Sequence, residues 1–76
     1  MKEALEAIIR AIVSDQEAVT IKEVEGEKSI ILEVKVAEGD MGKVIGREGR
    51  IAKAIRVVMK AVASKEQKRV SVEFID

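Results

Sequence analysis

The stretch VIGREGRIAKAI, Val44 to Ile55, places two glycines three residues apart in a segment whose apolar residues otherwise follow helical spacing. The whole chain contains only five glycines. Glycine adopts positive φ without a steric penalty, so Gly46 can end a short helix in a left-handed conformation and Gly49 can form a tight turn. The segment therefore predicts two helices joined by a turn of four residues, Gly46 to Gly49.

The predicted turn opens directly onto the second helix. The first N–H groups of a helix have no partner within it, and the helix dipole makes that end positive, so the turn is suited to an anion. Neither glycine carries a Cβ that would hold a phosphate away. Arg47, Arg50 and Lys43 add positive charge nearby. The pattern favours an anion-binding turn without naming the anion.

Regular elements flank the turn on both sides. Asp40 is placed to cap a short helix that begins at Met41 and ends at Gly46. The longer helix is predicted from about Arg50 to Ala63. Its expected buried stripe consists of Ile51, Ile55, Val58, Met59 and Val62, with Lys53, Arg56 and Lys60 outside the stripe.

The first half of the chain predicts one helix and a hairpin. A helix of about 3–14 carries Leu5, Ile8, Ile9, Ile12 and Val13 on one face. AVTIKEVE reads as a strand in which Val24 falls on the other face, hinting at a bulge or a frayed end. SIILEVKVA alternates cleanly, with Ile30, Leu32, Val34 and Val36 pointing one way, and EGEK around Gly26 suits a hairpin connection.

A final strand, RVSVEFID, completes the order α-β-β-α-α-β. The helical crossover before it is long enough for a parallel pairing with the second strand. We therefore expect a single two-layer α+β domain over residues 1–76. It should contain a three-stranded mixed sheet with all three helices packed on one face and the other face partly wet.

The positive and negative charges of the chain cancel overall but are unevenly distributed along the sequence. Fourteen basic and fourteen acidic residues give a formal net charge of zero. Residues 1–38 hold five bases and nine acids, whereas residues 39–76 hold nine bases and five acids. Within 43–60 six bases accompany one acid, Glu48. Since local potential governs the binding of polyanions, the second half can bind them in a neutral chain.

Composition excludes several classes of function. The chain has no Cys, His, Tyr or Trp, which argues against an ordinary nucleophile–base pair, a zinc site or any other metal centre, and no cofactor is expected. The N-terminus lacks the basic start of a signal peptide, and no apolar run is long enough to span a bilayer, so the cytoplasm is expected and a membrane partner is not. Phe74 is the only aromatic residue, which excludes modules that stack bases on exposed rings.

VIGREGRIAKAI resembles the V-I-G-x-x-G-x-x-I-x-x-I signature of the KH domain, and the element order resembles its type II (prokaryotic) form. Including DMGKVIG and KRVSVEFID, the whole chain resembles the KhpA family of small bacterial proteins made of one KH domain.

The resemblance implies binding of single-stranded RNA. In KH domains the G-x-x-G loop clamps the backbone of about four nucleotides, and a groove receives the bases. Carried over, Gly46, Arg47, Glu48 and Gly49 form the clamp. Lys43, Arg50 and Lys53 are flanking phosphate contacts, Ile45 and Ile51 belong to the core first and to the groove floor second, and strand residues near 30–36 form the opposite wall. The carboxylate of Glu48 would repel phosphate and make affinity modest.

Two other readings remain open at the level of the sequence. One is a module that pairs with other proteins, because the resemblance also implies self-association and pairing with a second KH protein of the Jag/EloR type. The other is a KH-like fold without RNA binding, like the BolA-type proteins, whose partner chemistry uses a histidine that this chain lacks. Our expectation is a dimeric RNA chaperone or post-transcriptional regulator, with single-stranded DNA as a possible alternative ligand.

Overall fold

The computed structural model describes residues 1–75 of the 76-residue chain. Its elements follow the predicted order, and short 3₁₀ turns connect some of them. The helices are α1 (Lys2–Ile12), α2 (Met41–Ile45) and α3 (Arg50–Lys65), and the strands are β1 (Thr20–Glu25), β2 (Ser29–Lys35) and β3 (Arg69–Ile75). The prediction for α1 runs two residues too far, and α3 continues two residues beyond the predicted Ala63.

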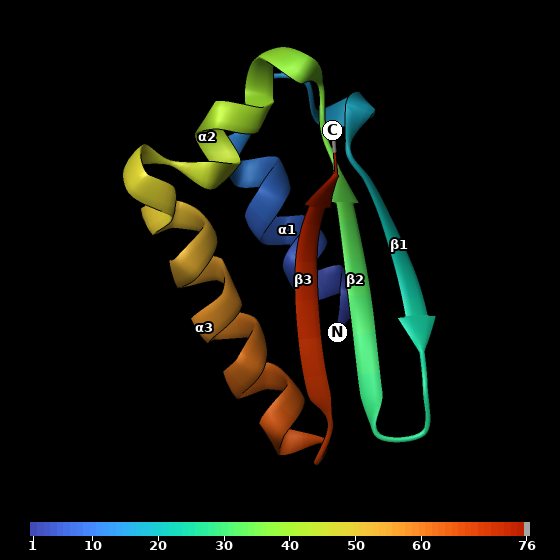
Figure 1. The fold of residues 1–76 in the computed structure, drawn as a ribbon. Helices are drawn as coiled ribbons and strands as arrows, with labels where there is room; N and C mark the ends of the chain where they lie inside the picture. The colour runs from blue at the N-terminus through green and yellow to red at the C-terminus, as the bar shows by residue number, and fades with distance from the viewer. Residues whose placement is uncertain (76) are drawn as a thin grey trace.

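The three strands form a mixed sheet in the order β1-β2-β3 (Figure 1). β1 and β2 pair antiparallel through a hairpin, and β2 and β3 pair parallel, as expected. The β1–β2 register runs without interruption and sets Val24 opposite Ile31, so the suspected bulge is absent from this ladder. Val24 simply lies on the outer face of the sheet, where it is exposed.

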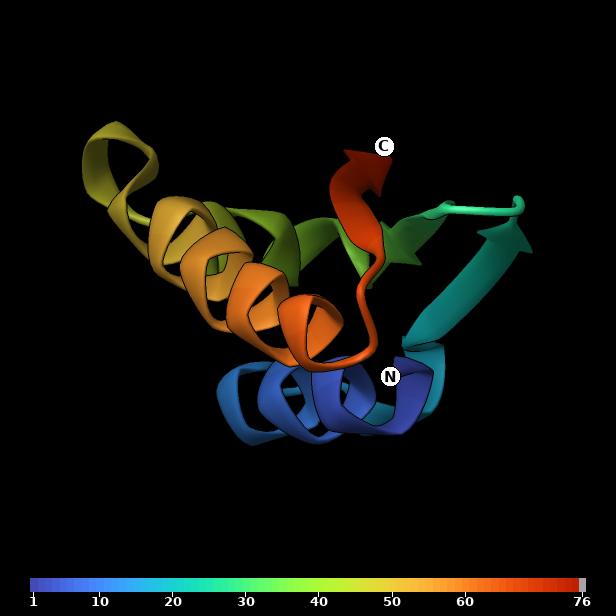
Figure 2. The same cartoon turned by 90° about the horizontal axis from the view of Figure 1, so that it is seen from below.

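Helices cover one face of the sheet, which gives the predicted two layers (Figure 2). The core combines the helix-facing residues of the strands with the inner faces of the helices. Its largest fully buried side chains are those of Leu5, Ile9, Leu32, Val34, Val44 and Met59. The outer face carries exposed residues such as Lys22 and Glu73 and is open to solvent.

α3 buries a narrower stripe than its hydrophobic pattern predicts. Its buried residues are Ala52, Ile55, Met59 and Ala63. Two residues of the predicted stripe are instead exposed, Ile51 at 37% and Val58 at 47%. The helix lies beside the edge strand β3 and against α1, and small alanine side chains allow its close approach. That approach rotates the two larger side chains out of the core, so this part of the prediction was wrong.

The C-terminus of α3 is closed by a Schellman motif, which turns the chain into β3. The N–H of Gln67 donates to the carbonyl of Ser64, and the N–H of Lys68 donates to the carbonyl of Ala63, both at 3.0 Å. Gln67 has φ 57°, the left-handed conformation that this motif requires. Within residues 1–75, none of the helices combines the length and the apolar character needed to cross a membrane.

Candidate functional site

The turn between α2 and α3 adopts three positive φ angles in four residues. Gly46 ends α2 with φ 78° and ψ 172°, and its N–H donates to the carbonyl of Gly42 at 2.9 Å. Glu48 has φ 58° and Gly49 has φ 74°, and both lie in the left-handed region. The predicted left-handed cap at Gly46 is therefore wrong in one respect, because its ψ is extended. The left-handed turn is made by the two residues that follow Arg47.

The two glycines have different physical reasons to be glycine. A Cβ added at Gly46 would lie 2.9 Å from the backbone nitrogen of Ile51, closer than real Cβ atoms approach. A Cβ added at Gly49 would meet nothing within 4 Å. Gly46 is thus required by the packing of the turn against α3. Gly49 is required only by its left-handed backbone, and the space in front of it is open.

Gly49 is also the N-cap of α3. Residues with a side-chain oxygen, such as Ser or Asp, usually occupy this position and accept a hydrogen bond from the first turn of the helix. Glycine has no side chain to do so. The N–H of Gly49 instead donates to the carbonyl of Gly46 at 3.1 Å and the N–H of Arg50 donates to the carbonyl of Arg47, so the turn satisfies these two donors itself. The sixteen residues of α3 add the positive end of a helix dipole at the same place. The turn can therefore attract an anion through the helix dipole and the exposed Arg47 and Arg50, beside the open space in front of Gly49.

The charged side chains of the turn are exposed. One guanidinium nitrogen of Arg50 lies 3.6 Å from a carboxylate oxygen of Glu48, and these side chains are 77% and 72% exposed. An ion pair so open to water is weak and leaves both groups free to rearrange. Among residues 1–75, no carboxylate lies within 4 Å of the basic groups of Arg47 or Lys53. The turn keeps a net positive potential despite Glu48.

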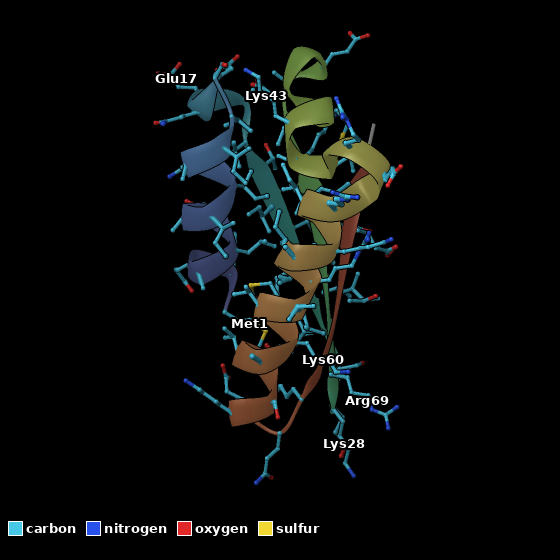
Figure 3. The ribbon with its side chains drawn as sticks, turned by 90° about the vertical axis from the view of Figure 1, so that its left-hand side faces the viewer. Met1, Glu17, Lys28, Lys43, Lys60 and Arg69 are labelled. Carbon is cyan, nitrogen blue, oxygen red and sulfur yellow. The ribbon has the colours of Figure 1, made fainter. Side chains whose placement is uncertain are left out.

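Lys43 points away from the turn, toward the end of α1 (Figure 3). Its ammonium group donates to the hydroxyl of Ser14 and lies 3.3 Å from a carboxylate oxygen of Asp40. The structure therefore does not bring Lys43 together with Arg47 and Arg50. The predicted role of Lys43 as a phosphate contact would require its side chain to leave these partners.

Asp40 precedes α2 as predicted, but its side chain makes no capping hydrogen bond to that helix. Its carboxylate instead accepts hydrogen bonds from the backbone N–H groups of Asp15, at 3.0 Å, and Ser14, at 3.1 Å. These two donors, followed by Lys43, lower the pKa of Asp40 although its burial acts in the opposite direction. Asp40 thereby ties the start of α2 to the segment after α1, a long-range contact that helical spacing could not predict.

The predicted apolar residues of the site are less buried than expected. Ile45, the last residue of α2, is partly buried against the core, and Ile51 is exposed on the side of α3 that faces α1. In the signature, the first isoleucine after the second glycine stands three residues beyond that glycine, and in this chain Ala52 occupies that position and is buried. The prediction that Ile51 belongs to the core was therefore wrong, because the buried residue is the next one along the helix.

The strand beside α3 is β3, and most of the predicted wall at residues 30–36 lies in the centre of the sheet. Its end, Lys35 and Val36, borders a hollow of about 490 Å³ that Glu38 and Met41 also line. β2 is the central strand, so its helix-facing side chains are buried and its backbone pairs with both neighbours. Across the seam between α3 and β3, Nε of Arg56 donates to the carbonyl of Val72 at 3.2 Å, and its guanidinium lies 5.5 Å from the ring centre of Phe74.

Arg56 is the residue that sequence reasoning left out of the site. Its spacing from Lys53 and Lys60, three residues before and four after, places all three on one flank of a helix. That flank faces β3, whereas Ile51 and Val58 occupy the flank that faces α1. α3 therefore separates a basic flank from an apolar one, and the residue spacing carried this signal.

No cluster of side chains with metal-ligand character occurs among residues 1–75.

Comparison with known proteins places the chain in a family. A sequence model described as "KhpA/KhpB, KH domain" matches residues 2–74. A protein of Clostridium acetobutylicum named "RNA-binding protein KhpA" is 61% identical over 99% of this chain and 100% of its own length. Proteins of the same name from Clostridium perfringens and Borreliella burgdorferi are 60% and 46% identical, over 99% and 97% of this chain and 100% and 90% of their own lengths.

Proposed function

The chain belongs to the KhpA/KhpB family of KH domains, and from this we propose that it binds single-stranded RNA through the Gly46–Gly49 turn, without a catalytic role. The observation that carries the proposal is the open space at the N-terminus of α3. A glycine N-cap, free space in front of Gly49, the positive end of the helix dipole and the exposed Arg47 and Arg50 together suit a phosphodiester.

The proposed roles of the other residues follow their positions. Arg47 and Arg50 approach the phosphates beside the turn, and Lys53 continues the positive surface along α3. Glu48 weakens the interaction through its negative charge, and its ion pair with Arg50 offsets part of that charge. Ile45 supports the turn from the core, and Ile51 holds it by packing against Gly46. Lys43 contributes long-range charge or a contact made after it releases Ser14.

The test is fluorescence anisotropy with a short degenerate single-stranded RNA at low and moderate salt. The variant carries Arg47→Asp together with Glu48→Asp, because Asp tolerates the left-handed conformation of position 48 and the fold should survive. We expect the wild type to bind in a salt-dependent manner and the variant to lose most of this binding. Competition with a degenerate single-stranded DNA of the same length measures whether the ribose hydroxyl contributes to affinity.

Lys2→Glu is the matched control, because it changes the net charge by the same amount at the far end of the molecule. Its new carboxylate lies in the first turn of α1, where a negative charge is favourable. Circular dichroism establishes that each variant is folded. Equal binding by the wild type and the folded double variant would contradict the proposed clamp.

A second candidate function is pairing with another protein, either a second copy or a KH protein of the Jag/EloR type. It is favoured by an apolar hollow of about 370 Å³ between α1 and α3, lined mainly by Ile8, Ile12, Ile51, Ala54, Ile55 and Val58. Of these, Val58 is 47% exposed and Ile51 is 37% exposed. Contiguous apolar surface of this kind marks interaction sites, and a dimer would present two turns to one RNA.

Analytical ultracentrifugation of the wild type and a Val58→Asp variant tests pairing separately from RNA binding, because Val58 lines the apolar hollow. A monomeric variant that still binds RNA would assign the apolar flank to pairing and the turn to RNA. A wild type that is monomeric at all concentrations would contradict self-association. For the cellular role we propose an RNA chaperone or post-transcriptional regulator in the cytoplasm.

A further inference from the structure

A pocket of about 650 Å³ lies at the end of α3 opposite the turn, where the helix gives way to β3. Its lining is rich in groups that bind phosphate. These residues are Lys60 and Ser64 of α3, Gln67 and Lys68 of the connection, and Arg69 and Val70 of β3. Figure 3 shows Lys60 and Arg69 near each other at this end of the molecule. No function described above uses this pocket.

The charges of the pocket are only partly compensated. Lys68 is held by an ion pair with Glu25, and this contact, reinforced by Glu66 and Glu23, raises the pKa of Lys68 and keeps it positive. Among residues 1–75, by contrast, no carboxylate lies within 4 Å of the charged groups of Lys60 or Arg69. Both side chains are exposed at the mouth of the pocket. The lining of the pocket therefore carries three cations and no carboxylate, and the acids near it gather around Lys68.

A row of three basic residues on α3 lies between this pocket and the turn. Lys53, Arg56 and Lys60 lie on the flank of α3 that faces β3, and Arg56 bridges the seam to Val72. From Gly49 to Lys60 the helix rises by roughly 16 Å. This exceeds the screening length of about 8 Å at physiological salt, so Lys60 and Arg69 act as separate contacts and add little to the potential of the turn.

We propose that the pocket is a second phosphate site, in which Lys60 and Arg69 hold the backbone of the same RNA strand beyond the nucleotides clamped by the Gly46–Gly49 turn. The hydroxyl of Ser64 and the amide of Gln67 can donate hydrogen bonds to the same phosphate. The strand would follow the seam between α3 and β3, past Arg56. This inference rests on the proposed function, and it assigns the protein a longer footprint than the clamp alone.

The experiment compares a degenerate RNA of about four nucleotides with one of about twelve, a range that spans the clamp and longer single-strand sites. Affinity is measured by anisotropy over a series of salt concentrations. The test variant is Lys60→Gln with Arg69→Gln. The control variant, Lys22→Gln with Arg10→Gln, removes the same pair of residue types from β1 and α1.

For the longer RNA we expect the salt dependence of the test variant to fall by about 1.4 in log–log slope, since each single-strand phosphate contact contributes about 0.7. For a tenfold fall in salt concentration, the wild type should therefore gain roughly 25-fold more affinity than the test variant. The shorter RNA should bind all three proteins alike, because it cannot reach the pocket. Lys60→Arg with Arg69→Lys should restore the slope.

A longer RNA also offers a single clamp more positions at which to bind, which raises its apparent affinity. This increase should be the same in the wild type and in both variants. If the test variant keeps the wild-type slope on the longer RNA, or loses no more than the control, the second site is overturned and the clamp stands. If the wild type binds neither RNA at any salt concentration, the proposed function is overturned and the second site with it.

Discussion

A Cβ built on Gly46 would lie 2.7 Å from Cγ1 of Ile51, so the first residue of the turn packs directly on the second residue of the helix that follows. Ile51 is itself partly open to solvent, yet its side chain and its backbone nitrogen close the space that any larger residue at position 46 would need. This contact sets the angle at which α2 delivers the chain to α3.

The two glycines of the turn should differ in their tolerance of alanine. Gly49→Ala places a Cβ in open space. Its only cost is the steric strain of alanine in a left-handed conformation, which should lower the free energy of unfolding by about 1–2 kcal/mol. Gly46→Ala suffers a backbone conformation nearly exclusive to glycine and a collision with Ile51, so its cost should be about 2–5 kcal/mol. Urea unfolding of both variants measures the difference. Equal losses would contradict the close packing described here.

Glu48→Asn should improve both stability and RNA binding. Asn adopts the left-handed conformation of position 48 more readily than Glu, and its amide carries no charge to repel phosphate. We expect the unfolding free energy to rise by about 0.5 kcal/mol and RNA affinity to increase, most visibly at low salt. Thermal unfolding and anisotropy measure the two effects. Glu17→Gln, which removes one exposed negative charge away from both proposed RNA sites, is the control for net charge.

Gln67 occupies the left-handed position of the Schellman motif at the end of α3, where glycine is the usual residue. Gln67→Gly should therefore stabilise the protein by up to about 1 kcal/mol, since it removes the steric cost of positive φ. Glu66→Gly is the control, because Glu66 has φ −101° and glycine there only increases the entropy of the unfolded chain. Urea unfolding should order the three proteins as Gln67→Gly, wild type and Glu66→Gly, from most to least stable.

Asp40 should make stability depend on acid pH. Its pKa is lowered in the folded protein, so its stabilising contribution is complete above the unfolded value, near about pH 4, and is lost as the pH falls through the folded pKa. Asp40→Asn offers one acceptor oxygen to two N–H donors. We expect a lower Tm at neutral pH and a shallower loss of Tm between about pH 5 and pH 2.

The pKa values of Glu3 and Glu25 are also lowered, so these groups contribute to acid sensitivity and the stability of the Asp40→Asn variant should still depend on pH. Glu3→Gln provides the comparison, because Glu3 is exposed at the N-terminus and its partner is the terminal amine. A pH profile of Asp40→Asn parallel to that of the wild type would contradict the assigned contact.

Local pattern in the sequence determined the element order, the hairpin, the face of each strand that is buried and the position of the turn. Alternation with period two sends Ile30, Leu32 and Val34 to one face whatever lies above them, and glycine marks where positive φ is needed. These features depend on neighbours in the chain, so they can be read from it.

Only the tertiary structure decided how α3 rotates, where Asp40 and Lys43 point, and which strand lies beside the helix. Ile51 and Val58 have larger apolar side chains than the alanines that are buried in α3, so hydrophobicity alone would bury Ile51 and Val58. The alanines are buried instead because the helix packs between α1 and β3. Asp40 reaches N–H groups about 25 residues away, which no local period encodes. The contacts that separate the basic flank of α3 from its apolar flank exist only once α1, α3 and β3 have packed together.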